Sequence, residues 1–343
     1  MNGPVRQLKR RELLKSSALA TALALGVTGR QGLRADTKTT PAATQPTSRD
    51  GQDPQQAPLI QVGILLGTFG RGTLEARLDA VKDSGLDCVQ LSLDSAGLSD
   101  MPEEIPTAVA AHIRREAKIR GITIAAAQGT FNMSHPDAEH RRRGLRQLRV
   151  LAEACAEMGT SRIHICTGTR DRENMWRRHS DNDSPAAWKD LVACLRKATD
   201  FARQTRVTLA FEPEVNNVVD SAQKARRLLD EIGSPFLKVT IDPANLFHAG
   251  ELPRMNEMLD GAFALVGKDI VLAHAKDLDH DGDAGHLPAG QGKLNYDRYV
   301  SLLHRYRFRG PLLLHGLSEA QVPGCVAFLR DKLARATSSP QEK

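Results

Sequence analysis

Residues 208–242, TLAFEPEVNNVVDSAQKARRLLDEIGSPFLKVTID, contain one complete strand–helix–strand unit. The apolar runs 208–211 and 237–241 predict two short strands, and a carboxylate follows each of them. Between them a helix is predicted from Ser221, and Gly233 stands where a residue with positive φ commonly ends a helix. Two strands joined by such a helix are expected to lie parallel, with a right-handed crossover.

The same unit recurs along the chain from Leu59 onward. Strands are predicted at 60–66, 88–93, 123–127, 162–166, 208–211, 237–241, 270–275 and 311–314. Helices are predicted to start near Thr73, Glu104, Ala138, Pro185, Ser221, Arg254, Tyr296 and Gln321. Eight alternating units in about 280 residues favour a closed barrel over an open sheet. We therefore predict an α/β fold, a single-domain (β/α)8 TIM barrel over residues 59–336, followed by a disordered tail at 337–343.

Positive charge is concentrated at the start of the chain. The first 35 residues hold seven of the 47 Lys and Arg and one of the 41 Asp and Glu, so residues 36–343 hold 40 of each. The body of the protein therefore carries no overall basic field of the kind that recruits polyphosphates. Nucleic acid is not an expected partner.

The basic start of the chain resembles a twin-arginine export signal. Residues 9–15, KRRELLK, precede a weakly apolar run at 16–27 that is shorter than the about 20 residues of a membrane span. We interpret residues 1–35 as this signal and residues 36–58, rich in Thr, Pro, Gln and Ser, as a disordered linker. A periplasmic protein without a membrane span in its mature form is expected. Because no clean A-x-A cleavage site is present, an uncleaved signal that anchors the protein is the alternative.

Four of the later predicted strands end in residues that commonly bind metals. Glu212 and Asp242 follow the fifth and sixth strands, and His274 and His315 follow or end the seventh and eighth. The carboxyl ends of barrel strands meet at one mouth, where the active sites of such barrels lie. Two carboxylates and two imidazoles suit Mn²⁺, Zn²⁺, Co²⁺ or Fe²⁺ better than Mg²⁺, which prefers oxygen ligands. The sequence therefore predicts one divalent metal held by these four residues.

The motifs around these residues resemble a known family. FEPE at 211–214, IDPANL at 241–246, HAKD at 274–277 and GPL at 310–312 are similar to motifs of the sugar phosphate isomerase/epimerase family, in the xylose isomerase-like TIM barrel superfamily. The resemblance covers roughly residues 60–333. It implies a metal bound by Glu, Asp, His and Glu. It also implies that the first and last Glu act as an acid–base pair on opposite faces of a ketose, while the metal stabilises an enediolate.

The chain departs from the family pattern at two positions. His315 stands where Glu is usual, and Asn245 stands where a substrate-contacting His is common. A histidine can bind a metal and can transfer protons near neutral pH, so we predict Glu212 and His315 as the catalytic residues. A metal-bound imidazole keeps only one free nitrogen. The symmetric two-carboxylate mechanism of the family is therefore in doubt here.

Further residues are predicted to contact substrate. Lys276 and Glu214 lie two residues beyond the ligands His274 and Glu212, although an ion pair of Lys276 with Asp277 or Glu214 is an equal alternative. The long polar segment 167–185 follows the fourth strand and is predicted to cover the mouth as a lid. The full set of predicted substrate contacts is Asn245, Lys276, Glu214, Arg170, Trp176 and His179.

The predicted function is that of a metal-dependent sugar isomerase or epimerase with a small carbohydrate substrate. A lyase or hydrolase acting on an oxidised glycoside could use the same site. An endonuclease IV-like DNA repair enzyme is disfavoured, because it needs about three metals and a basic groove. A non-catalytic sugar-binding barrel is the remaining alternative, and a homo-oligomer is compatible with all four. Residues 279–283, DHDGD, resemble the start of a calcium loop but lack its distal Glu, so a solvated loop is predicted there.

Overall fold

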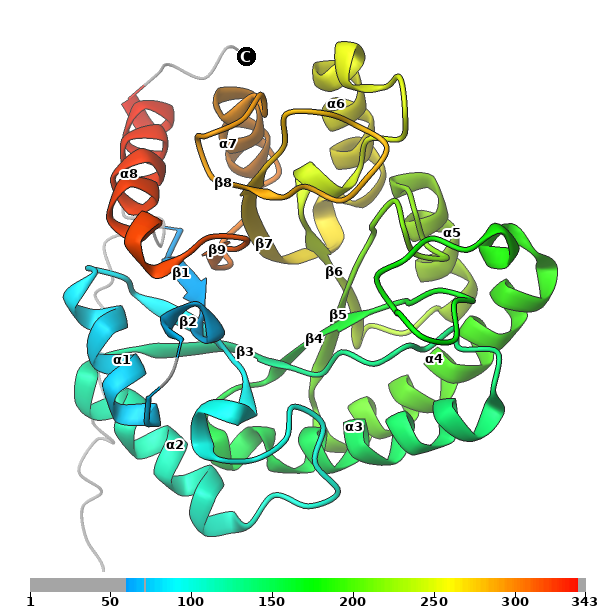
Figure 1. Ribbon diagram of the computed structural model, residues 1–343, viewed down its shortest axis with the longest axis horizontal. Coiled ribbons are helices and arrows are strands. Elements are labelled where there is room, and N and C mark those ends of the chain that lie inside the picture. Colours follow the sequence, from blue (N-terminus) through cyan, green and yellow to red (C-terminus); the bar gives the residue numbers. More distant parts are fainter. Residues whose placement is uncertain (1–59, 71, 339–343) are drawn as a thin grey trace, which may run out of the picture. The chain divides into compact units, whose positions relative to one another are not determined.

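Parallel strands close into a barrel in the computed structural model, which describes residues 60–70 and 72–338. Each barrel strand pairs in parallel with the next barrel strand along the chain, and the first pairs with the last to close the ring. The barrel strands are β1 (Val62–Leu65), β2 (Cys88–Leu91), β3 (Thr123–Gln128), β4 (Arg162–Cys166), β5 (Thr208–Glu212), β6 (Leu237–Ile241), β7 (Ile270–Asp277) and β9 (Leu312–Leu314). The predicted (β/α)8 barrel is thereby confirmed (Figure 1).

Helices surround the barrel on its outer side (Figure 1). They are α1 (Leu74–Asp83), α2 (Thr107–Arg120), α3 (Ala138–Met158), α4 (Pro185–Thr205), α5 (Ala222–Ile232), α6 (Met255–Val266), α7 (Tyr296–Arg305) and α8 (Val322–Ser338). The observed starts agree closely with the predicted ones except for α2, which begins after Pro106 rather than at Glu104. A residue that precedes proline is disfavoured in helical conformation, so Pro106 delays this helix.

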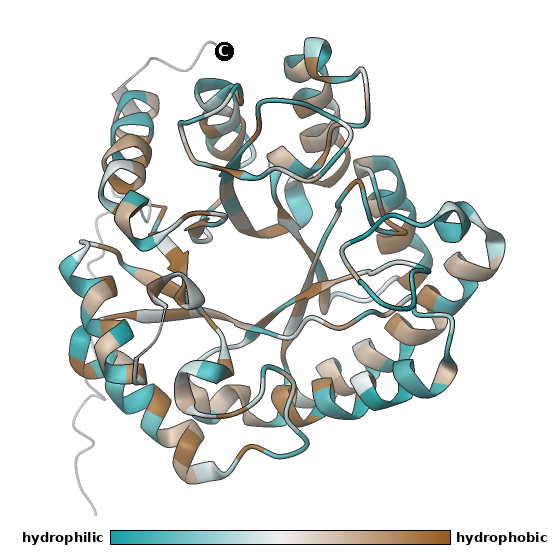
Figure 2. Ribbon diagram, viewed as in Figure 1, coloured by the Kyte–Doolittle hydropathy of each residue, from teal (hydrophilic) through white to brown (hydrophobic). Residues whose placement is uncertain are grey.

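The ends of α5 follow from the residues noted in its sequence. The Ser221 hydroxyl accepts a hydrogen bond from the Lys224 backbone N–H at 3.3 Å, which caps the first turn. Gly233 ends the helix in the left-handed conformation, with φ of 62°. Apolar residues fill the strands, and hydrophilic residues lie along the outward faces of the helices (Figure 2). Strands covered on both faces are expected to be apolar in this continuous way.

A short strand that the sequence did not predict follows β7. In β8 (Leu287–Pro288), Pro288 pairs antiparallel with Lys276 at the end of β7. The Asp277 carboxylate holds this turn together, because it accepts hydrogen bonds from the backbone N–H groups of Gly290 and Leu294. The segment 278–286 between β7 and β8 therefore lies at the mouth of the barrel.

Some predictions fall on residues that the structure does not describe. The predicted export signal at 1–35 and linker at 36–58 lie outside the described residues. Helix α8 continues to Ser338, two residues into the predicted tail, and the rest of that tail is not described. Among the described residues, no helix is both long and apolar enough to cross a membrane.

Candidate active site

The four predicted ligands lie at the carboxyl ends of neighbouring strands. Glu212 is the last residue of β5, and Asp242 directly follows β6. His274 lies in the second half of β7, and His315 directly follows β9. Glu212, Asp242 and His274 are buried, whereas 32% of the His315 side chain is exposed. We call these four residues the barrel cluster.

The side chains of the barrel cluster point toward one another. His274 Nδ1 lies 3.6 Å from Glu212 Oε2 and 3.9 Å from Asp242 Oδ2. His315 Nδ1 lies 3.6 Å from the same Asp242 oxygen. The structure therefore brings Asp242, His274 and His315 within ligand distance of one another, and Glu212 joins this group through its contact with His274.

Three atoms of this cluster are buried without a hydrogen-bond partner. They are Asp242 Oδ2, His274 Nδ1 and His315 Nδ1, and the three residues can each place one ligand atom within 4.8 Å of the others. Leaving a buried polar atom unpartnered costs about 1–3 kcal/mol, so three such atoms side by side indicate that a ligand belongs between them. Carboxylate and imidazole donors fit a divalent transition cation.

A glutamine that the sequence analysis did not select orients His274. The His274 Nε2–H donates a hydrogen bond of 3.1 Å to Oε1 of Gln90, the third residue of β2. This bond places a proton on Nε2, so that, when the ring is neutral, Nδ1 presents its lone pair to Asp242 and Glu212. Gln90 in turn donates to Gln128 at the end of β3. In the sequence, Gln90 is marked as a candidate site residue only by being an amide within an apolar strand.

Glu212 is held by two further side chains. Asn245 Nδ2 donates to Glu212 Oε1 at 2.7 Å, and the amide oxygen of Asn245 accepts from the Gly285 N–H at 3.0 Å. Asn245 therefore positions Glu212, and a substrate contact of its own stays a prediction. His164 is buried in β4 with Nε2 3.5 Å from Glu212 Oε2. Burial, and then His274, lower the pKa of His164 to about 3, so its ring is neutral.

Lys276 is the cation of the site. Its Nζ lies 3.4 Å from Asp242 Oδ2, and only 5% of the residue is exposed. Burial alone would lower the pKa of Lys276, but the carboxylates of Asp242 and Glu212 outweigh burial and raise it. Asp277, the alternative partner, is occupied by backbone N–H groups. Burial, together with the nearby Glu212 carboxylate, raises the pKa of Glu214 to about 8.

The charges of the site leave a net negative pocket for a cation. Burial opposes ionisation of Glu212, but its interactions with His274 lower its pKa below the usual range. Burial opposes ionisation of Asp242 as well, and there Lys276 lowers the pKa. When the His274 ring is neutral, as metal binding requires, two carboxylates against one ammonium leave one uncompensated negative charge. This balance suits a divalent ion, as does the donor set.

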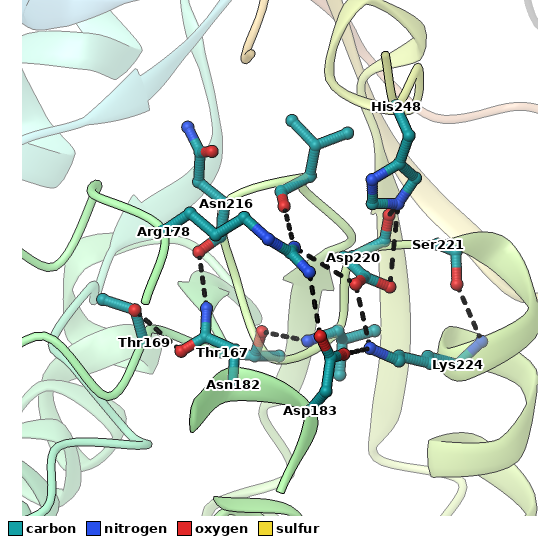
Figure 3. A network of polar contacts seen from close by, with 12 residues as sticks. Thr167, Thr169, Arg178, Asn182, Asp183, Asn216, Asp220, Ser221, Lys224 and His248 are labelled. Atoms are coloured by element: carbon teal, nitrogen blue, oxygen red, sulfur yellow. Dashed lines mark hydrogen bonds and ion pairs between the residues drawn. The ribbon is translucent and has the colours of Figure 1, made fainter. Parts of the chain in front are cut away.

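The long segment after β4 is fixed by a polar network (Figure 3). Arg178 donates to the Val215 carbonyl at 2.7 Å and to the carboxylates of Asp220 and Asp183. Lys224, in the first turn of α5, binds the same two carboxylates at 2.9 and 2.6 Å. The network joins the β4–α4 segment to the β5–α5 segment, and both border the mouth of the barrel.

The three predicted lid residues do not join the barrel cluster. Arg170 donates to the Ser134 carbonyl and to the Asp190 carboxylate at 2.8 Å, so its guanidinium is already bound. His179 Nδ1 accepts from the Asp181 N–H at 3.1 Å and caps a short helix. Trp176 is 47% exposed. Their contact with a substrate stays a prediction.

An open cleft of about 670 Å³ leads to His315. It runs between the ends of β1 and β9 on one side and β8 on the other, and Thr68, His286 and Gln321 also line it. A small polar molecule could therefore reach His315 from solvent.

The chain is similar in sequence to curated proteins. A curated relative, L-ribulose-5-phosphate 3-epimerase UlaE of Escherichia coli, is 24% identical over 262 residues, which cover 74% of this chain and 87% of the relative. The same enzyme of Salmonella heidelberg matches equally well.

Solved structures share the fold at low sequence identity. A xylose isomerase domain protein from Planctomyces limnophilus superposes with a TM-score of 0.65 at 16% identity, covering 83% of this chain and all (100%) of that one. The 3-keto-D-glucoside 4-epimerase YcjR of Escherichia coli superposes with a TM-score of 0.62 at 18% identity, covering 82% and 100%. At these identities the superpositions speak for the fold alone.

A family model matches most of the barrel. The xylose isomerase-like TIM barrel family matches residues 78–331, from the first helix to the last. This span contains the whole barrel cluster and all the side chains that orient it. The protein therefore belongs to the xylose isomerase-like TIM barrel family.

Proposed function

We propose that the protein is a metal-dependent sugar isomerase or epimerase that moves a proton on a carbon next to a carbonyl. The observation that carries this proposal is the group of three buried ligand atoms without a hydrogen bond, on Asp242, His274 and His315. Family membership and the epimerase activity named for the curated relative support it. The proposed ligands are the four residues of the barrel cluster, and the proposed metals are Mn²⁺, Zn²⁺, Co²⁺ and Fe²⁺.

A divalent cation bound in this cluster would supply a Lewis acid for the oxygens of a carbonyl and a neighbouring hydroxyl. The surrounding side chains would orient the metal ligands and bind the substrate. Gln90 keeps the lone pair of His274 Nδ1 directed into the site. Asn245 holds Glu212 through Oε1 and leaves Oε2 facing the centre. Lys276 would bind a negatively charged oxygen, since its ammonium is already desolvated.

Glu212 and His315 are the proposed proton-transfer residues. Their strands, β5 and β9, are separated by β6 and β7 in the ring, so the two side chains approach the centre from different directions. Burial, countered in part by the nearby Asp242 carboxylate, lowers the pKa of His315 below its usual value, which favours the unprotonated ring at neutral pH. The two groups therefore differ in charge, with a carboxylate on one side and a neutral imidazole on the other.

Metal analysis tests the proposed ligand set. The protein is stripped with a chelator, dialysed against Mn²⁺ or Co²⁺, and its bound metal is measured for wild type, H315A and H304A. We expect H315A to bind the metal more weakly than wild type. His304 provides the matched control, because it lies on the outer helix α7 with Nδ1 2.9 Å from the Val300 carbonyl oxygen. Unchanged metal affinity in H315A would remove His315 from the ligand set.

Proton exchange tests the proposed chemistry. The metal-loaded protein is incubated in D2O with free ketopentoses and ketohexoses and with their 5- and 6-phosphates, and deuterium is located by NMR. Deuterium on C3 of a 2-ketose whose carbonyl is retained indicates an epimerase. Deuterium on the carbon next to a newly formed aldehyde indicates an aldose–ketose isomerase. If no sugar of either group exchanges, the chain is better described as a sugar-binding barrel.

The unequal pair of Glu212 and His315 favours a second candidate, a lyase or hydrolase that acts on an oxidised glycoside. Elimination needs a base on one side and a separate group that assists the leaving oxygen, so it does not require two equivalent carboxylates. The test is release of the alcohol from a 3-keto-glucoside under the same conditions. Release without epimerised sugar would favour this candidate.

We also propose that the protein is exported through the twin-arginine pathway. The motif KRRELLK at residues 9–15 supports this, and it lies outside the described residues. Replacing Arg10 and Arg11 by Lys should retain the protein in the cytoplasm, as fractionation would measure. If the location of the variant matches that of wild type, the signal is of another kind.

A further inference from the structure

A second group of metal-binding residue types lies outside the barrel cluster, on the segment between β7 and β8. It consists of Asp279, His280 and His286, which can each place one ligand atom within 4.8 Å of the others. All three side chains are exposed, by 53%, 61% and 42%. We call this group the rim cluster. Residues 279–283, which resemble the start of a calcium loop, overlap it, but its ligand types are different.

One carboxylate oxygen lies at the centre of the rim cluster. His280 Nδ1 lies 2.5 Å and His286 Nε2 lies 3.2 Å from Asp279 Oδ1. The two rings are tilted with their centroids 4.7 Å apart, so their nitrogens face the same point. Ligands around a tetrahedral Zn²⁺ bind at about 2.0–2.1 Å and therefore lie about 3.3 Å from each other. Exposed side chains reach this spacing by small rotations.

The backbone that carries these residues is held in place. Asp283 Oδ1 accepts from Asn216 Nδ2 at 2.6 Å, and Asp281 Oδ2 accepts from the Leu252 N–H at 2.8 Å. The Gly282 N–H donates to the Phe247 carbonyl at 2.9 Å, and the His286 N–H donates to the Asp277 carbonyl at 3.1 Å. Asp281 and Asp283 are thus used as anchors, not as calcium ligands. A fixed backbone lowers the entropy that binding a cation would cost.

A comparable group elsewhere on the surface lacks these properties. Glu75, His112 and Glu116 also gather three ligand types. There Arg115 contacts His112 Nδ1 at 2.5 Å, and Arg120 binds Glu116 at 2.8 Å. A guanidinium already fills the place of a cation in that group. Among the described residues, Asp279 has no Lys or Arg as an ion-pair partner.

We propose that Asp279, His280 and His286 form a second site for a divalent transition cation of the Zn²⁺ class, at the rim of the barrel mouth. Two imidazoles and a carboxylate are typical ligands for such a cation, and they leave a coordination position open. His286 also lines the cleft that leads to His315. A cation at the rim would therefore lie beside the path of an entering molecule. This inference does not depend on the proposed activity.

Zinc binding to single and combined variants tests the second site. Chelator-stripped protein is dialysed against buffered Zn²⁺, and bound zinc is measured for wild type, the double variant H280A/H286A, H112A and D242N. We expect the double variant to bind about one equivalent less than wild type, while H112A binds as wild type does. Equal zinc in wild type and the double variant overturns the proposal. A similar loss in H112A also overturns it, because it indicates non-specific binding to surface histidines.

The outcome for D242N separates this inference from the proposed function. A normal zinc content in D242N together with a loss in H280A/H286A supports the rim site and counts against the barrel site. As a second readout, Zn²⁺ should protect His280 and His286 of the wild type from modification by diethyl pyrocarbonate, as measured by mass spectrometry. Protection should be absent at His304. If His280 and His286 react equally with and without Zn²⁺, the rim site does not exist.

Discussion

The barrel cluster and the rim cluster contain the same types of ligand but differ in their surroundings. In the barrel cluster, Asp242 Oδ2, His274 Nδ1 and His315 Nδ1 are buried and make no hydrogen bond. In the rim cluster, the two histidines already contact Asp279 and are open to water. Unpartnered buried atoms raise the free energy of the metal-free protein, so a cation gains more there than at the rim. The comparison predicts a tight site inside and a weaker one outside.

The largest expected effect is that of D242N. The amide keeps the shape of Asp242 but removes the charge that faces His274, His315 and Lys276. Metal binding in the barrel should be lost, and proton exchange in D2O should fall by about 10³-fold or more, since a bound metal supplies several kcal/mol.

The matched control for D242N is D260N. Asp260 lies on the outer helix α6 and pairs with Arg298, far from the proposed chemistry in the fold. It should retain wild-type exchange rates. Full exchange activity in D242N would mean that the barrel cluster is not the site of the reaction.

The next effect concerns acid stability and His164. The pKa of this buried histidine is about 3, against a usual value of 6.5. Between these values the unfolded chain binds a proton that the folded chain does not, so the free energy of unfolding falls as pH is lowered through this window. The loss is at most about 1.4 kcal/mol per pH unit. Urea unfolding of metal-free H164Q should show a flatter acid slope than wild type.

The control for H164Q comes from the rim cluster. H280Q makes the same change at an exposed ring, and it should leave the acid slope of wild type in place. An unchanged slope in H164Q would mean that His164 is not held neutral by burial. Such a result would weaken the view that the barrel cluster is strongly desolvated.

The convergence of the barrel cluster could be predicted because it follows from strand periodicity. Parallel strands of one barrel end at the same mouth, so a carboxylate or imidazole after each of four apolar runs had to gather there. Strand periodicity does not identify Gln90 and His164 as site residues, because a polar residue inside an apolar strand resembles a packed core residue in sequence. What identifies them is the atom that they contact, His274 Nε2 or Glu212 Oε2, and no spacing along the chain encodes this.

The rim cluster could not be predicted for a different reason. Asp279 and His286 meet because the segment between them is pinned by Asn216 and Phe247, which belong to the β5–α5 and β6–α6 connections. These contacts between loops depend on tertiary structure. The two-residue strand β8, which contains a proline, is likewise too short to give a periodic signal.

A smaller effect is expected from Q90L, which tests how the His274 ring is oriented in the barrel cluster. Leucine preserves bulk but removes the acceptor for His274 Nε2–H. Loss of such an orienting hydrogen bond typically lowers metal affinity by about 10–100-fold. A competition titration with a coloured chelator would measure it. Q128L, one hydrogen bond further from the metal, should lower the affinity less, and the reverse order would contradict the proposed chain of contacts.

The smallest effect is expected for H280A in metal-free protein. The His280 ring is 61% exposed, and its ion-pair and ring partners within the described part of the chain, Asp279 and His286, belong to its own loop. Substitutions at such exposed positions usually change the free energy of unfolding by less than about 0.5 kcal/mol. Addition of Zn²⁺ should then stabilise the wild type more than H280A, because only the wild type retains both imidazoles at the rim. If metal-free H280A were destabilised by several kcal/mol, the rim cluster would be part of the folding core, and the contrast with the barrel cluster would fail.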